Sequence, residues 1–138
     1  MKHRKLRKSN KQRRAEIKIA RLKRAKALKG KYDVFKPPIP RGAELADYTQ
    51  LNHVCPCTIL PLYYVDHPFI CRDCGAQEVW TASQQKWWYE VAKGRLDSIA
   101  VRCRPCRKKQ RARKAEARAI HLAGLQLKQL KKLRALTP

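Results

Sequence analysis

Two Cys-x-x-Cys pairs constrain the folding of this chain more than any other feature of its sequence. Cys71 and Cys74 form the first pair, Cys103 and Cys106 form the second, and 28 residues lie between the pairs. Each pair turns sharply enough to present two thiolates to one ion, and four thiolates complete the tetrahedral coordination of zinc. Disulfides are the competing interpretation, which a reducing cytosol disfavours. The spacing therefore predicts one structural Zn²⁺ ion bound by these four cysteines.

The segment between the two pairs is longer than the ~15–20 residues usual in such sites, which leaves room for a helix. Thr81 and Gln84 match a capping box, and Gly94 suits the left-handed residue that ends a helix. We therefore expect one helix over residues 82–93. The face expected to cover the strands of the domain, together with Trp80, consists of Trp87, Trp88 and Val91.

Tyr89 shares another face of this predicted helix with Lys86 and Lys93. An aromatic ring beside two cations is suited to stacking on a nucleic-acid base. Aromatic residues beside a zinc site more often belong to the core. Tyr89 is therefore a candidate for base stacking, with a core position as the alternative.

The residues around the cysteines resemble a family of bacterial probable zinc-ribbon proteins. The shared motifs are a Cys-x-x-Cys-Gly knuckle, a Trp-Thr-Ala step, a Gln-Gln-Lys-Trp-Trp-Tyr-Glu-x-Ala-Lys-Gly helix and an Arg-Cys-x-x-Cys-Arg knuckle. The resemblance covers about residues 62–115 and implies a metal-binding ribbon without naming an activity. In this chain the motifs occupy residues 71–75, 80–82, 84–94 and 102–107, preceded by a related stretch at 64–69.

The net charge of the chain is +24, which demands a polyanionic partner. The charge is unevenly placed: residues 1–31 carry +14, residues 32–101 carry −2 and residues 102–138 carry +12. A nearly neutral middle is thus flanked by two basic arms. At this size a purely hydrophobic core is marginal, which again favours a metal as an additional support.

The N-terminal arm, residues 1–31, is predicted to be helical over 9–29, with Gly30 ending the helix. Its apolar residues are scattered around the helix, so it has little to bury in the core of the chain. We expect a frayed or disordered arm that folds when phosphates neutralise its charge. A solubilising tail and an organellar import segment are the alternatives.

Residues 32–61 contain a proline-rich stretch at 35–40 and are predicted to form an extended linker. Cys55 and Cys57 lie in this segment, close to His53 and followed later by His67. These four residues are candidates for a second metal site, but a proline between two cysteines makes a poor knuckle. We interpret the two cysteines as thiols outside the metal site.

The C-terminal arm, residues 108–138, belongs to a second predicted helix that begins near Arg104. Its first half is basic, and its second half has a leucine stripe made of Leu122, Leu125, Leu133 and Leu136. The stripe is predicted either to pack on the chain's own central domain or to dock on a protein partner or a second copy.

Together these features predict a small zinc ribbon at residues 62–107, with short β-strands and one helix between two cysteine knuckles, and with long basic α-helical extensions on both sides. No apolar run approaches the roughly 18–20 residues of a membrane span, and no catalytic motif is present. Four cysteines leave zinc no open position, so an enzyme is disfavoured.

The predicted function is binding of RNA, most plausibly ribosomal RNA in a cytoplasmic ribosomal particle. A DNA-binding regulatory or nucleoid protein is the alternative, and a zinc-dependent enzyme is a more remote one. The candidate nucleic-acid contacts are Lys2, Arg4, Lys5, Arg7, Lys8, Lys11, Arg13, Arg14, Lys18, Arg21, Lys23, Arg24, Arg104, Arg107, Lys108, Lys109, Arg111, Arg113 and Lys114.

Overall fold

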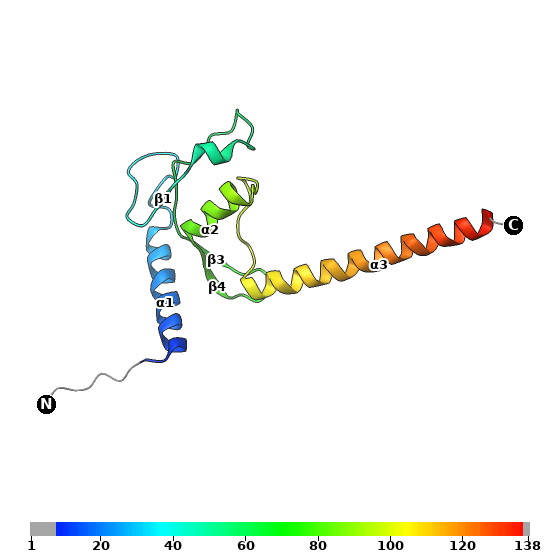
Figure 1. The fold of residues 1–138 in the computed structure, drawn as a ribbon. Coiled ribbons are helices and arrows are strands. Elements are labelled where there is room, and N and C mark those ends of the chain that lie inside the picture. Colours follow the sequence, from blue (N-terminus) through cyan, green and yellow to red (C-terminus); the bar gives the residue numbers. More distant parts are fainter. Residues whose placement is uncertain (1–7, 137–138) are drawn as a thin grey trace. The chain divides into compact units, whose positions relative to one another are not determined.

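The computed structural model describes residues 8–136, which form two compact units that divide after Val101. The first unit contains all of the strands and the shorter helices, and the second consists mainly of one long helix (Figure 1). The elements of the first unit are α1 (Asn10–Leu28), β1 (Glu44–Leu45), the 3₁₀-helix η1 (Tyr48–Leu51), β2 (Tyr63–Tyr64), β3 (His67–Ile70), β4 (Gln77–Trp80), α2 (Ala82–Lys86) and the π-helix η2 (Trp87–Val91). The second unit contains α3 (Arg104–Leu136).

Two small antiparallel sheets form the framework of the first unit. In one sheet, β1 pairs with β2, and Glu44 lies opposite Tyr64. In the other, β3 and β4 form a hairpin in which His67 lies opposite Trp80 and Ile70 opposite Gln77. The turn of this hairpin therefore contains the first cysteine pair.

An aromatic cluster forms the core between these sheets and the helical segment that follows them. Tyr64 and Tyr89 stack with ring centroids 5.7 Å apart, and Trp80 meets Tyr89 at the same centroid distance of 5.7 Å but tilted by 60°. Leu51 and Ala82 complete the buried cluster. Offset and tilted aromatic pairs contribute about 0.5–1.5 kcal/mol each beyond the area that they bury.

A buried carboxylate joins the helical segment to the chain that follows β1. Glu90 is 3% exposed, and its side chain accepts a 2.8 Å hydrogen bond from the backbone N–H of Asp47. Its second oxygen lies 3.2 Å from the ammonium group of Lys86. A buried charge is tolerated only when it is paired and hydrogen-bonded, and Glu90 meets both conditions.

The helix between the cysteine pairs begins as the sequence predicts but does not remain regular. Thr81 caps α2, and Gln84 completes the capping box. From Trp87 to Val91 the chain is a π-helix, in which the N–H of Ala92 donates to the carbonyl of Trp87. The predicted single helix over 82–93 is therefore wrong in its second half.

The face of this segment that lies in the core is not the predicted one. Ala82, Gln85 and Tyr89 are buried, and their spacing of three and then four residues places them on one face of a helix with 3.6 residues per turn. Trp87 and Val91 are 58% and 66% exposed, although they were expected to cover the strands. The residue with a left-handed backbone at the end of the segment is Lys93, with φ of 54°, and not Gly94.

Tyr89 lies in the core, so the base-stacking interpretation of this residue is wrong. Its side chain is 6% exposed, and its hydroxyl donates a 2.8 Å hydrogen bond to the carbonyl of Ser98. Burial, with a smaller contribution from the charge of Asp97, raises the pKa of Tyr89 to about 12. Tyr64 stacks on this ring and Trp80 packs against it at a tilt, so the buried ring is not accessible to a base.

Helix α1 is a folded part of the first unit rather than an arm that lacks a packing surface. It begins with a capping box formed by Ser9 and Gln12, and the left-handed Gly30, with φ of 76°, follows its end as predicted. The helix packs on β3 and β4, and Ala25 is completely buried. The expectation of a frayed arm with little to bury is wrong for these residues.

Two lysines fix α1 against the β3–β4 hairpin. The ammonium group of Lys18 lies 2.6 Å from the carboxylate of Glu78, and that of Lys26 donates to the side-chain oxygen of Gln77 at 2.7 Å. Both partners lie on β4, and both are more than 50 residues away in the sequence. These contacts, together with the small Ala25, replace the wide apolar stripe that the sequence lacks.

The segment predicted to be an extended linker contains β1 and η1 and is fastened to the first unit. Tyr63 is fully buried, and its hydroxyl donates to the carbonyl of Asp33 at 2.9 Å. The N–H of Leu62 donates to the carbonyl of Val34 at 2.8 Å. The prolines therefore give this segment an irregular path, but they do not leave it without structure.

Helix α3 is continuous over 33 residues, which agrees with the predicted helix. The side chains of its leucine stripe are more than 40% exposed on the helix, namely Leu122, Leu125, Leu133 and Leu136. Whether the leucine stripe packs on the central domain or docks on a protein partner or a second copy stays a prediction. Among residues 8–136, no helix combines the length and apolar character that crossing a bilayer requires.

Replacing Gly94 by alanine is predicted to destabilise the first unit. A Cβ atom at this position would overlap the indole ring of Trp88, so the ring or the backbone has to move. We expect a loss of about 1–3 kcal/mol in the free energy of unfolding, measured by denaturant titration of the zinc-loaded protein. The matched control is Gly124→Ala, whose Cβ meets nothing within 4 Å. That change is expected to raise helicity, by about 1 kcal/mol in helix propensity; equal effects of both variants would contradict the assignment.

Candidate metal centre

The turn of the β3–β4 hairpin shapes the first half of the site. The N–H of Gly75 donates to the carbonyl of Cys71 at 2.9 Å, and the N–H of Cys71 donates to the carbonyl of Ala76 at 2.9 Å. Gly75 has φ of 70°, a conformation that glycine adopts without steric cost. This tight turn places Cys71 and Cys74 on one side of the chain.

The start of α3 supplies the second half. Cys103 precedes the helix, and its carbonyl accepts a 2.9 Å hydrogen bond from the N–H of Arg107. Cys106 lies in the first turn of the helix, directly after Pro105. The positive end of a helix dipole favours the thiolate form of a cysteine, which is the form that binds metal.

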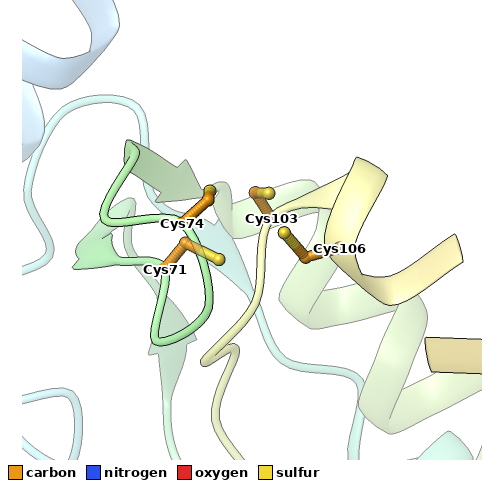
Figure 2. A group of neighbouring side chains, drawn as sticks. All are labelled: Cys71, Cys74, Cys103 and Cys106. Atoms are coloured by element: carbon orange, nitrogen blue, oxygen red, sulfur yellow. The ribbon is translucent and has the colours of Figure 1, made fainter. Parts of the chain in front are cut away.

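Figure 2 shows the side chains of the four cysteines converging from these two segments. Their sulfur atoms all lie within 4.8 Å of one another. A Zn–S bond of about 2.3 Å places tetrahedral ligands about 3.8 Å apart, so small side-chain adjustments bring all four into coordination. Cys71 and Cys103 are 2% and 4% exposed, whereas Cys74 is exposed. The donor set and its spacing fit one zinc ion.

The electrostatics of such a site favour cations close by. Four thiolates and one Zn²⁺ sum to a charge of −2, which needs local compensation. Four arginines are immediate sequence neighbours of the cysteine ligands, namely Arg72, Arg102, Arg104 and Arg107. The backbone N–H of Arg72 also donates to the carbonyl of Val101 at 3.0 Å, which holds the chain shortly before Cys103 beside the first knuckle.

The other candidate ligands do not gather in this way. Within the described part of the chain, no cluster of three or more metal-binding side chains includes His53, Cys55, Cys57 or His67. Cys55 and Cys57 are exposed in a turn closed by the N–H of Thr58, and hydrogen bonds from Cys57 lower the pKa of the Cys55 thiol. Their interpretation as thiols outside the metal site stays a prediction.

The basic candidates divide into three groups. Lys2, Arg4, Lys5 and Arg7 lie outside the described residues. Along α1, Lys11, Arg13, Arg14 and Lys23 are exposed, whereas Lys18 pairs with Glu78; Lys8, which precedes the helix, pairs with Glu16. The first turns of α3 present exposed cations at Arg104, Arg107, Lys108, Lys109, Arg111, Arg113 and Lys114.

Arg41 is a cation that sequence analysis did not single out. It follows Pro40 in a segment predicted to be a linker, and it lines the same cavity as Arg21 and Arg24 of α1. No local pattern marks such a residue, because its neighbours in space come from distant parts of the sequence. Its position next to the Gly42 break is the one local signal of an ordered turn.

The comparisons with known proteins agree with the metal site. A family model described as a probable treble clef domain matches residues 65–115. The match covers all four cysteines and confirms a zinc-binding domain related to the predicted zinc ribbon over this segment. No curated protein and no solved structure matches the chain.

One zinc ion per chain is predicted, held by Cys71, Cys74, Cys103 and Cys106. Structural zinc in small domains contributes about 10–16 kcal/mol of apparent binding energy, so chelation is expected to unfold the β3–β4 hairpin and the start of α3. Metal analysis and circular dichroism of the purified protein measure both effects. Cys74→Ser is expected to lose the metal, whereas the control Cys57→Ser keeps one equivalent. An unchanged fold after chelation, or metal loss in the control, would contradict this assignment.

Proposed function

We propose that this protein is a non-catalytic RNA-binding protein, associated with ribosomal RNA in a cytoplasmic ribosomal particle. The single observation that supports this best is the packing of α1, which is held on the β3–β4 hairpin while several of its other cations stay exposed. A basic helix that is already ordered presents charges at fixed spacing. Such an array suits the regularly spaced phosphates of a nucleic acid.

The charges of α1 support this proposal in detail. Lys18 and Lys26 are engaged with β4. Lys11, Arg13, Arg14 and Lys23 are exposed, and within the described residues they take part in no ion pair. Their charges are therefore available to phosphates, and neutralising them on binding breaks no ion pair of the described chain.

The first turns of α3 add a second basic surface. Residues 107–114 contain six cations and no acid, and all six are exposed. Like charges this close repel one another along a helix, and bound phosphates relieve that repulsion. Two basic helices attached to a small zinc domain are suited to grooves of folded RNA.

The metal centre favours a structural role over a catalytic one. Catalytic zinc sites keep one position for water or substrate, whereas four cysteines fill a tetrahedron. Binding of DNA by the same charges is the alternative, and the two partners differ in groove shape and in the 2′-hydroxyl. The experiment below therefore includes both nucleic acids.

Neutralising the outer face of α1 is predicted to weaken RNA binding and its dependence on salt. Each phosphate contact contributes about 0.7 to the slope of log affinity against log salt for a single strand. The variant with Lys11, Arg13, Arg14 and Lys23 all replaced by Gln is expected to lower this slope by up to about 3. Binding to structured ribosomal RNA and to duplex DNA is measured across a salt series, with sedimentation of ribosomal particles as a second readout.

The matched control keeps the charge and changes only the side chains, by exchanging lysine and arginine at the same four positions. It is expected to keep the slope, while circular dichroism verifies that both variants stay helical. An unchanged slope in the neutralised variant would make α1 a solubilising element. Tighter binding to DNA than to RNA at every salt concentration would replace RNA with DNA as the partner.

A further inference from the structure

A cavity opens beside α1, away from the metal site. Its volume is about 230 Å³, and its walls come from four separate segments of the first unit. Helix α1 contributes Arg21, Arg24 and Leu28 to the lining. The other three segments are residues 41–44 at the turn before β1 and its start, residues 65–66 between β2 and β3, and residues 81–83 at the start of α2.

Three arginines line this cavity. Arg21 and Arg24 are three residues apart and therefore neighbours on one face of α1, and Arg41 adds a third from the turn. Within the described residues, none of the three takes part in an ion pair. Arginine is the side chain best suited to phosphate oxygens, because its planar fork donates two parallel hydrogen bonds.

Two carboxylates also line the cavity, and each is already held in place by one oxygen. Asp66 accepts a 2.9 Å hydrogen bond from the N–H of Ala82 through Oδ1. Glu44 accepts a hydrogen bond from the hydroxyl of Ser83 through Oε1. The remaining oxygen of each carboxylate can accept a hydrogen bond from a ligand. A ligand that fits this lining has both an anionic group and a hydroxyl donor.

The volume of the cavity limits the size of the ligand that it can hold. Pockets that enclose a drug-sized ligand measure about 300–1,000 Å³, so this smaller cavity suits part of a nucleotide. A phosphate and its ribose have the required combination of charge and hydroxyl groups, and the base then stays outside. DNA offers the phosphate but lacks the 2′-hydroxyl.

We propose that this cavity binds one phosphate-ribose unit of an RNA strand, with Arg21, Arg24 and Arg41 on the phosphate and Glu44 accepting a hydrogen bond from the 2′-hydroxyl. The inference rests on the proposed RNA-binding function and adds to it the feature that distinguishes RNA from DNA. The outer cations of α1 attract either nucleic acid. The cavity selects RNA.

The first test compares two variants that remove the same charge. In one, Arg21, Arg24 and Arg41 are replaced by Gln; in the other, Lys11, Arg13 and Lys23 are replaced by Gln. Affinities are measured for a short single-stranded RNA of mixed sequence, for DNA of the same sequence and for the 2′-O-methyl RNA. The cavity variant is expected to reduce the RNA-to-DNA affinity ratio roughly tenfold, whereas the control variant weakens both ligands equally.

The second test uses the sign of a charge change. Glu44→Gln removes a negative charge, so electrostatics alone predicts tighter binding to both RNA and DNA. The proposal predicts a lower RNA-to-DNA affinity ratio and no change in the ratio of 2′-O-methyl RNA to DNA. Circular dichroism and zinc content verify that each variant is folded.

The outcomes separate this inference from the proposed function. Equal effects of the two triple variants on the ratio overturn the cavity proposal but leave RNA binding intact, whereas a wild-type protein that does not bind RNA overturns the proposed function itself. If a ribonucleoside 5′-monophosphate binds more tightly than the RNA and the cavity variant abolishes its binding, the site belongs to a free nucleotide and the RNA assignment is overturned. Weaker binding of the monophosphate than of the RNA, together with a lower RNA-to-DNA affinity ratio in the cavity variant, supports the proposal.

Discussion

Mutual repulsion among four thiolates is the constraint on which the rest of the first unit depends. Four negatively charged sulfur atoms within 4.8 Å of one another repel strongly unless a cation lies between them, which is the position of Cys71, Cys74, Cys103 and Cys106. A two-stranded hairpin such as β3–β4, with four residues in each strand, is marginal on its own. Metal coordination at the turn of the hairpin adds the stability that two short strands lack. Helix α1 packs on the same hairpin. We therefore expect loss of the metal to loosen the packing of α1 through the hairpin.

A second support comes from the aromatic core, which is independent of the metal ligands. Tyr89 lies between Tyr64 and Trp80, and the buried Glu90 connects the same π-helical segment to Asp47. Burial first and the charge of Glu90 second raise the pKa of Tyr64, so this phenol stays neutral at physiological pH. The hairpin is thus held at its turn by metal and at its open end, near Trp80, by aromatic packing.

The parts of the structure that could be predicted are those encoded locally. The four ligands, the capping box at Thr81 and the glycine after α1 follow from spacing and side-chain chemistry within a few residues. The core face of residues 82–91 was not predicted, because the apolar Trp87 and Val91 are exposed whereas the polar Gln85 is buried. The packing of α1 was missed because two of its contacts are polar and join residues more than 50 positions apart. Ser9 and Gln12 form a local signal for the start of α1, the same capping pattern that Thr81 and Gln84 form at the start of α2.

The contact between Trp88 and Gly94 has a consequence for how this domain can vary. The carbonyl of Trp88 accepts a 2.8 Å hydrogen bond from the N–H of Gly94, and its indole N–H donates to the hydroxyl of Ser98 at 2.8 Å. The indole ring occupies the space in which any residue other than glycine at position 94 would place its Cβ. We therefore expect a side chain at position 94 to fit only when position 88 holds a residue smaller than tryptophan. In related sequences, this expectation pairs a larger residue at one position with a smaller residue at the other.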